Sequence, residues 1–224
     1  MSPTSSDSTR IDSISLNGVL PRVFLNEPVP PSEVWQSRLT FSRGETCLVE
    51  ATSGAGKSSL CAFIYGLRTD YEGTILFDKT DSSTFDIPRW QALRRRNLAY
   101  LPQEPGLFPE LTALENIRLK NNLTGHLAES TISEWIDLLG LSSRKDRPAG
   151  RLSVGQQQRV ALIRALCQPF DFILLDEPVS HLDPENNRIA ANLIHSEASR
   201  QNAGIIATSV GNHILLPYSR TLKL

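Results

Sequence analysis

The chain has 224 residues, of which 40% are hydrophobic, and its 23 basic and 24 acidic residues leave a formal net charge of −1. A chain of this length can bury the core of one α/β domain with a small subdomain, which argues against a second independent domain. The balanced, interspersed charges lack the basic footprint of a nucleic-acid-binding protein, so we expect no nucleic-acid partner. The densest basic run, residues 94–96, indicates a solvated helix face, with contact to a phospholipid or a protein partner as the alternative.

The cysteines and the N-terminal residues bear on the compartment. Cys47, Cys61 and Cys167 stand among apolar residues and form no C-x-x-C pair, which indicates buried free thiols in a reducing compartment. Residues 1–11 are rich in Ser, Thr and Asp and lack the apolar segment of a signal peptide, so we expect a disordered tail. No stretch approaches the ~18 apolar residues of a membrane span. We therefore expect a cytoplasmic protein that meets a membrane only through a partner.

The first part of the chain predicts an antiparallel β subdomain. Short runs of alternating apolar residues are typical of half-buried strands, and turn residues separate them. A run at residues 23–25 is expected to continue the sheet before three prolines interrupt it. The expected strands cover residues 14–16, 23–25, 38–41, 46–50 and 74–77.

The middle of the chain is mainly helical. Residues 86–88 predict the start of a short helix that reaches about Arg96. Thr112 and Thr131 are each followed three residues later by Glu, the pattern of a capping box, which predicts helices over 112–120 and 131–139. A strand is expected at 98–101, and Gly140 is expected to end the second capped helix. We interpret residues from about 88 to 150 as a helical subdomain inserted into the domain of residues 12–224.

The last third of the chain alternates helices and short, fully apolar strands. Such strands are typical of a parallel sheet that helices cover on both faces. The fold class is therefore α/β, with a mostly parallel sheet, the antiparallel β subdomain at the N-terminus and the inserted helical subdomain. The expected elements are a helix at 156–166, a strand at 172–175, a helix at 183–199, a strand at 204–208 and short strands at the end.

A loop of small residues between a strand and a helix start predicts a phosphate-binding site. Residues 51–59 read Ala-Thr-Ser-Gly-Ala-Gly-Lys-Ser-Ser, which matches the P-loop pattern except that Ala51 replaces its first glycine. A helix start leaves backbone N–H groups unpaired, and glycine lets the backbone approach an anion closely. Lys57 is expected to reach the β- and γ-phosphates and Ser58 to ligate Mg²⁺. The phosphate-binding residues are expected to be Ser53, Gly54, Ala55, Gly56, Lys57, Ser58 and Ser59.

Two adjacent carboxylates follow the buried strand at 172–175. Asp176 is expected at the C-terminal edge of the sheet, where open α/β sheets bind ligands, and near a P-loop it is expected to hold Mg²⁺. Glu177 can then polarise a water molecule for attack on the γ-phosphate. Taken alone, the pair is also compatible with a solvated turn before Pro178.

The stretch Leu152-Ser153-Val154-Gly155-Gln156-Gln157-Gln158-Arg159-Val160, with Ile173-Leu174-Leu175-Asp176-Glu177-Pro178 downstream, resembles the signature and Walker B motifs of ABC proteins. From about residue 12 to its end, the chain resembles the ATP-binding subunit of an ABC transporter. Within that family it looks most like the ATPases of bacterial lipoprotein-release, macrolide-export and cell-division systems. The resemblance implies an ATP hydrolase that uses ATP and Mg²⁺.

The resemblance also implies roles for particular residues. Gln103 matches the glutamine that contacts Mg²⁺ and the attacking water. The implied catalytic residues are Glu177, Gln103 and Lys57. The implied metal ligands are Ser58, Gln103 and Asp176. Ser153, Gly155 and Gln156 of the signature would contact ATP held by the P-loop of a second copy, and residues 180–183 resemble the D-loop at that interface. Phe24 matches the aromatic residue that stacks on adenine, although an aromatic residue there is equally compatible with the core.

The implied partners are a second ATP-binding subunit and an integral-membrane permease. Two chains would close head to tail around two Mg-ATP molecules, and the helical subdomain with the loop at 104–110, which contains Phe108, would dock the permease. The protein would then lie on the cytoplasmic face of the inner membrane.

The sequence departs from the family pattern at positions that bear on the rate. Ser209 stands where the family has its switch histidine, and a serine cannot carry positive charge; His213 is a weaker substitute. Val154 replaces a signature glycine, and Ala51 is tolerable only with a negative φ. An alternative function is therefore an ATP-gated, non-transport or regulatory switch with slow or no hydrolysis.

Overall fold

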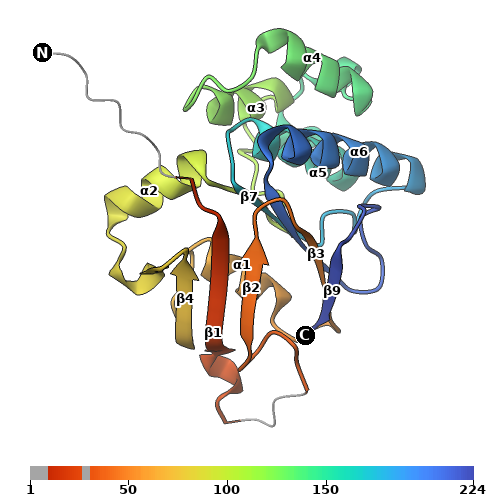
Figure 1. Cartoon of the computed structure of the whole chain (residues 1–224). Coiled ribbons are helices and arrows are strands. Elements are labelled where there is room, and N and C mark those ends of the chain that lie inside the picture. Colours follow the sequence, from red (N-terminus) through yellow and green to blue (C-terminus); the bar gives the residue numbers. More distant parts are fainter. Residues whose placement is uncertain (1–9, 27–30) are drawn as a thin grey trace, which may run out of the picture.

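The computed structural model describes residues 10–26 and 31–224, and the helices and strands of these residues form two sheets with helices packed around them (Figure 1). The N-terminal sheet has the order β2-β1-β4-β5 and is antiparallel throughout. Its strands are β1 (Ser13–Pro21), β2 (Arg38–Ser42), β4 (Tyr71–Phe77) and β5 (Thr80–Asp81). The expected antiparallel opening is confirmed for the strands at 14–16, 38–41 and 74–77, whereas the expected strand at 46–50 belongs to the second, parallel sheet.

The second sheet has the order β6-β7-β8-β3-β9 with parallel pairing throughout. Except for the edge strand β9, its strands are almost entirely buried, which explains their largely apolar sequences. They are β3 (Thr46–Glu50), β6 (Leu98–Leu101), β7 (Phe172–Asp176), β8 (Gly204–Ser209) and β9 (Arg220–Lys223). The helices are α1 (Lys57–Ile64), α2 (Ile87–Arg96), α3 (Ala113–Asn121), α4 (Glu129–Leu138), α5 (Val154–Leu166) and α6 (Pro184–Gln201).

Alternate residues of the parallel strands serve two hydrophobic cores, because successive side chains point to opposite faces. On one face, Ile173 and Leu175 pack with α3, α4, α5 and α6. On the other, Phe172 and Leu174 pack with α1 and with the antiparallel sheet. The arrangement confirms the expected α/β fold with a P-loop core and places α1 between the two sheets.

The inserted helical subdomain is shorter than expected. Its ends are joined at Leu111 and Ala149, where the Ala149 N–H donates to the Leu111 carbonyl at 2.8 Å, and at the Thr112–Pro148 bridge. The expected start near residue 88 is too early, because α2 packs its Trp90 against Phe77 of the antiparallel sheet and β6 belongs to the parallel sheet. The insertion comprises α3, α4 and two short 3₁₀ turns, Ser142–Arg144 and Ala149–Arg151.

Other boundaries also differ from expectation. Residues 23–25 do not continue the sheet: Pro21, which has no N–H to donate, ends β1, and a 3₁₀ turn, Arg22–Phe24, follows. The helix α4 begins at Glu129, two residues before the expected Thr131 cap, and Ala128 caps it without a side-chain hydrogen bond. Most of the expected tail lies outside the described residues, but Ile11 is buried and donates its N–H to Asp171 at 2.9 Å, so the tail ends before it.

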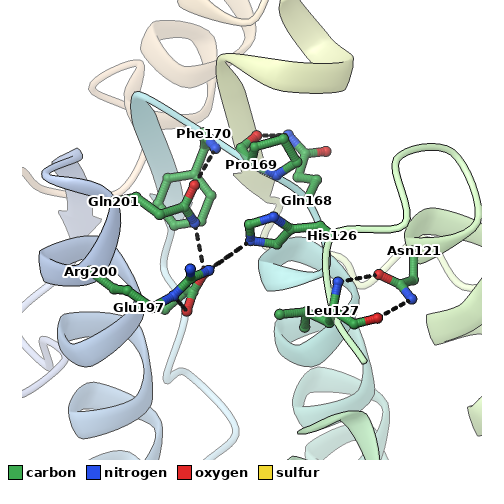
Figure 2. A network of polar contacts seen from close by, with 9 residues as sticks. All are labelled: Asn121, His126, Leu127, Gln168, Pro169, Phe170, Glu197, Arg200 and Gln201. Carbon is green, nitrogen blue, oxygen red and sulfur yellow. Dashed lines mark hydrogen bonds and ion pairs between the residues drawn. The ribbon is translucent and has the colours of Figure 1, made fainter. Parts of the chain in front are cut away.

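A polar network around the buried carboxylate of Glu197 fastens the helical insertion to the core (Figure 2). His126, between α3 and α4, lies 3.1 Å from the Glu197 carboxylate on α6, and Arg200 donates to the same oxygen at 2.6 Å. Gln201 also donates to that oxygen, at 2.7 Å, and accepts from the Phe170 N–H. Burial alone would raise the pKa of Glu197, but hydrogen bonds from His126 and Arg200 outweigh it, so the pKa is lowered.

Three cysteines are buried and free. Burial raises the pKa of Cys47 to about 11 and of Cys167 to about 12. None of the helices in residues 10–26 and 31–224 is long and apolar enough to cross a bilayer.

Candidate functional site

The loop between β3 and α1 forms an anion cradle. Gly56 has a φ of 98° and caps α1 without a side-chain bond, a conformation that only glycine adopts easily. Among the hydrogen bonds of the described residues, the N–H groups of Gly54, Gly56, Lys57 and Ser58 have no acceptor. Ala51 is outside the left-handed region that needs glycine, so its methyl group fits the loop. Free N–H groups at a helix start are suited to phosphate oxygens.

Lys57 lies within this loop, where it is 4% exposed. Its ammonium group donates to the Thr52 carbonyl at 2.9 Å and lies 3.5 Å from the Glu177 carboxylate. Glu177 has a φ of 47°, a strained value for a residue with a side chain. The chain thus holds the expected base and the expected phosphate-binding lysine as an ion pair.

Asp176 lies at the end of β7, 1% exposed, where its Oδ1 accepts a hydrogen bond from the Thr208 hydroxyl at 2.9 Å. Thr208 is the register partner of Asp176 on β8, and its hydroxyl also lies 3.3 Å from the Glu177 N–H. Thr208 thus fixes both carboxylate residues. Sequence reasoning missed it, because only the pairing of β7 with β8 brings it there.

A cavity of about 420 Å³ lies over the loop. Gln103 and Glu177 reach it from the ends of two other segments, so most of the expected P-loop and catalytic residues meet at one place. The lining residues are Ser53, Gly54, Gly56, Lys57, Ser58, Ser59, Gln103, Glu177 and Val210. Asp176 is not among the described residues that line this cavity, but it directly precedes Glu177, which is.

The donor set of this cavity fits Mg²⁺. A hard cation of this kind prefers oxygen ligands, and the exposed Ser58 hydroxyl and Gln103 amide both line the cavity. Asp176 would add a carboxylate. These three are the ligands expected from the sequence, and their assignment stays a prediction.

Two aromatic residues lie against the loop. A Cβ atom on Gly56 would lie 3.3 Å from Phe24 and 3.0 Å from Trp35. The Trp35 indole N–H donates to the Ala55 carbonyl at 3.0 Å. Phe24 is therefore beside the P-loop, as an adenine-stacking residue must be, while Trp35 was not among the expected site residues.

The signature residues lie elsewhere on the chain. Ser153 caps α5 in a capping box with Gln156: its hydroxyl accepts from the Gln156 N–H at 3.3 Å, and the Gln156 amide oxygen accepts from the Ser153 N–H at 3.1 Å. A Cβ atom on Gly155 would lie 2.8 Å from the His181 carbonyl, so α5 touches the loop after β7. Among the described residues, the lining of the phosphate cavity does not include Ser153, Gly155 or Gln156.

Neither candidate for the switch residue points to the cavity. Ser209 is 1% exposed and its hydroxyl donates to the Asn212 carbonyl at 2.8 Å. The His213 ring lies edge-on to Tyr218, with centroids 5.9 Å apart. Val210, 42% exposed, is the residue of this loop that lines the cavity.

Comparisons with known proteins agree with this geometry. Residues 35–180 match the family described as ABC transporter. The chain is 35% identical over 178 residues to the cytochrome c biogenesis ATP-binding export protein CcmA of Methylococcus capsulatus, covering 79% of this chain and 82% of that protein. It is 32% identical over 190 residues to the lipoprotein-releasing system ATP-binding protein LolD of Novosphingobium aromaticivorans, covering 83% and 84%.

Solved structures show the same fold. A dimeric bacterial ABC transporter cassette matches with a TM-score of 0.74 and 26% identity, covering 88% of this chain and 87% of that one. A dimeric ATP-binding cassette in a post-hydrolysis state, bound to ADP and Pi, matches with a TM-score of 0.74 and 24% identity over 89% and 88%. The chain therefore belongs to the ABC transporter family, and it is an ABC-type ATP hydrolase built on a P-loop fold.

Proposed function

We propose that the chain is the ATP-binding and ATP-hydrolysing subunit of a transporter, and that it closes head to tail with a second copy around two Mg-ATP molecules to drive a separate membrane permease. The observation that carries this proposal is the separation of two halves of the site. The P-loop, Gln103 and Glu177 share one cavity, whereas the capped start of α5 with Ser153 stands outside it. A second chain can supply the missing half.

Different residues of the cavity have different roles in ATP binding and hydrolysis. The free N–H groups of the P-loop and the Lys57 ammonium group bind the phosphates. ATP competes with Glu177 for Lys57, since the ammonium now lies 3.5 Å from that carboxylate. The released carboxylate then accepts a proton from the attacking water. Mg²⁺, held by Ser58, Gln103 and Asp176, would neutralise charge on the phosphates.

A hydrophobic groove favours a permease as partner. Phe108, Leu119 and Leu123 are exposed by 55%, 44% and 49%, and with Tyr65, Tyr100 and Pro102 they line a cavity of about 340 Å³. Arg164 joins this groove to the loop that begins at Gln103, because its guanidinium donates to the Gly106 carbonyl at 3.0 Å. A permease segment that binds here could sense the nucleotide through that loop, and it would hold the chain at the cytoplasmic face of the membrane.

The environment of Ser209 favours a second candidate, an ATP-gated switch with slow hydrolysis. Its hydroxyl donates to the Asn212 carbonyl, and Val210 lines the cavity with an aliphatic side chain instead. A positioned proton-transfer group typically contributes about 10²- to 10⁴-fold in rate.

The deciding experiment measures Mg-ATP turnover together with mass by light scattering, for the wild-type chain and for Glu177→Gln. Turnover by the wild type, with an inactive Glu177→Gln that accumulates as an ATP-bound dimer, supports the transporter ATPase. Dimerisation of both chains without turnover by either supports the switch and contradicts the catalytic role of Glu177. Binding without any dimer contradicts the two-chain site.

A further inference from the structure

Trp35 is buried against the phosphate loop although it comes from a distant part of the chain. Its side chain is 4% exposed, and its indole N–H donates to the Ala55 carbonyl at 3.0 Å. The contact joins the segment between β1 and β2 to the turn between β3 and α1. Among the described residues, no other side chain donates a hydrogen bond to a backbone carbonyl of residues 53–56.

This hydrogen bond sets the direction of the next N–H group. In a trans peptide unit the C=O and the following N–H point in opposite directions and lie in one plane. The Ala55 carbonyl points to the indole, so the Gly56 N–H points away from it. Gly56 lines the cavity over the loop, and its N–H has no acceptor among the described residues.

The surroundings of Trp35 are rigid. The Ser32 hydroxyl accepts from the Val34 and Trp35 N–H groups at 3.0 and 2.9 Å, which fixes the backbone that carries the indole. Phe63 of α1 packs edge-on against the ring, with centroids 6.4 Å apart. The ring atom Cζ2 lies 3.0 Å from the position of a Cβ on Gly56, so the indole also fills the space beside that residue.

We propose that Trp35 is a positioning residue for nucleotide binding: its indole N–H holds the Ala55 carbonyl outward, and thereby aims the Gly56 N–H at the phosphate chain of ATP before ATP arrives. The inference rests on the proposed function, because it assumes that this cavity takes ATP. It adds a residue that acts on the cradle from outside and touches no phosphate itself.

The test removes the indole N–H and keeps an aromatic side chain at position 35. Trp35→Phe, with Trp90→Phe as the matched control, is compared with the wild type for Mg-ATP affinity by calorimetry and for KM and kcat. Trp90 packs on Gly66 and the Phe77–Phe85 cluster, away from the loop. A finer version places β-(3-benzothienyl)alanine, a tryptophan isostere with sulfur in place of N–H, at position 35 in a Trp90→Phe/Trp135→Phe chain.

Loss of one neutral hydrogen bond is expected to weaken ATP binding about 3- to 10-fold. The loss should fall on KM with kcat within about two-fold, because the bond acts on ground and transition states alike. The isostere should reproduce the loss of ATP affinity in a chain that remains folded, and Trp90→Phe should bind like the wild type. In the Trp90→Phe/Trp135→Phe chain, the emission of Trp35 should shift with ATP and saturate at the calorimetric affinity.

Equal ATP affinity of the isostere and of tryptophan would overturn the inference while leaving the proposed function intact. A loss of affinity that Trp90→Phe shares equally would also overturn it, since the effect would then be general. A wild-type chain that binds no ATP would contradict the proposed function, and the inference would fall with it.

Discussion

A histidine at position 210 is expected to raise the rate of ATP hydrolysis, whereas one at position 209 is expected to damage the fold. The reason is the different setting of two adjacent side chains. Val210 is 42% exposed and lines the cavity that also holds Lys57 and Glu177. Ser209 is 1% exposed and its hydroxyl donates to the Asn212 carbonyl.

The magnitudes follow from these settings. An exposed substitution at Val210 should change stability by no more than about 0.5 kcal/mol. Its imidazole should recover part of the ~10²- to 10⁴-fold that a positioned proton-transfer group supplies, and we expect about ten-fold. At Ser209, overpacking costs about 1–3 kcal/mol and the unpaired Asn212 carbonyl about 1 kcal/mol. Together these correspond to a melting temperature lower by about 5–15 °C.

The assay is Mg-ATP turnover and thermal denaturation of Val210→His, Ser209→His and the wild type, with Val210→Ala as the control for lost bulk. Faster turnover by Val210→His alone, with a wild-type melting temperature, supports the reasoning. If Ser209→His is stable and faster than Val210→His, then position 209 faces the terminal phosphate and the orientation argued here is wrong.

Two further predictions concern the helical insertion and the signature. Because the pKa of Glu197 is lowered below its ordinary 4.5, its ionised form stabilises the fold fully above that pH, and the contribution is lost as the pH falls through the native pKa. Glu197→Gln should therefore cost about 1–3 kcal/mol at pH 7, a melting temperature lower by about 2–10 °C. The difference from wild type should shrink as the pH falls below 4.5; a difference that stays constant as the pH falls contradicts the role of the charge. Gly155→Ala places a Cβ 2.8 Å from the His181 carbonyl and must shift that loop or the start of α5. It should weaken ATP-driven dimerisation of a Glu177→Gln chain by light scattering, with ATP affinity of the monomer unchanged, and an unaltered dimer would show that this contact is unimportant for closure.

Local patterns predicted much of the fold because neighbouring residues determine them. Continuous apolar runs marked strands such as Phe172–Asp176, and the Thr112–Glu115 capping box marked the start of α3. The other expected box failed, since Thr131 lies inside α4. The helix starts at Glu129 without a side-chain cap, so the Thr131 and Glu134 pair lies within the first turns and not at the N-cap.

The edges of the helical insertion could not be read from periodicity. The helix α2 has a side-chain N-cap, Asp86, as α3 has Thr112, yet its Trp90 packs on the antiparallel sheet. The contacts of Leu111 and Thr112 with Ala149 and Pro148 reveal where the insertion closes, and they join residues far apart in sequence.

The same distinction separates the site residues that were expected from those that were missed. The P-loop is continuous in sequence, so its glycines and Lys57 were visible as a motif. Trp35 reaches the loop from a different segment, and Thr208 reaches Asp176 across a strand pair. Neither tryptophan nor threonine by itself indicates a phosphate-binding site. The roles of Trp35 and Thr208 follow only from their contacts in the folded chain.

The departures from the family pattern differ in kind. Replacement of the first P-loop glycine by Ala51 causes no backbone strain, because φ at this position is outside the left-handed region. Val154, at the start of α5, and Val210, at the phosphate cavity, are 50% and 42% exposed, so each presents an aliphatic side chain to solvent in the single chain. In the head-to-tail pair that we propose, both side chains would lie on covered surfaces. Burying them there favours the closed pair by about 25 cal/mol per Å² of apolar surface, which strengthens ATP-driven closure without adding any group that speeds hydrolysis.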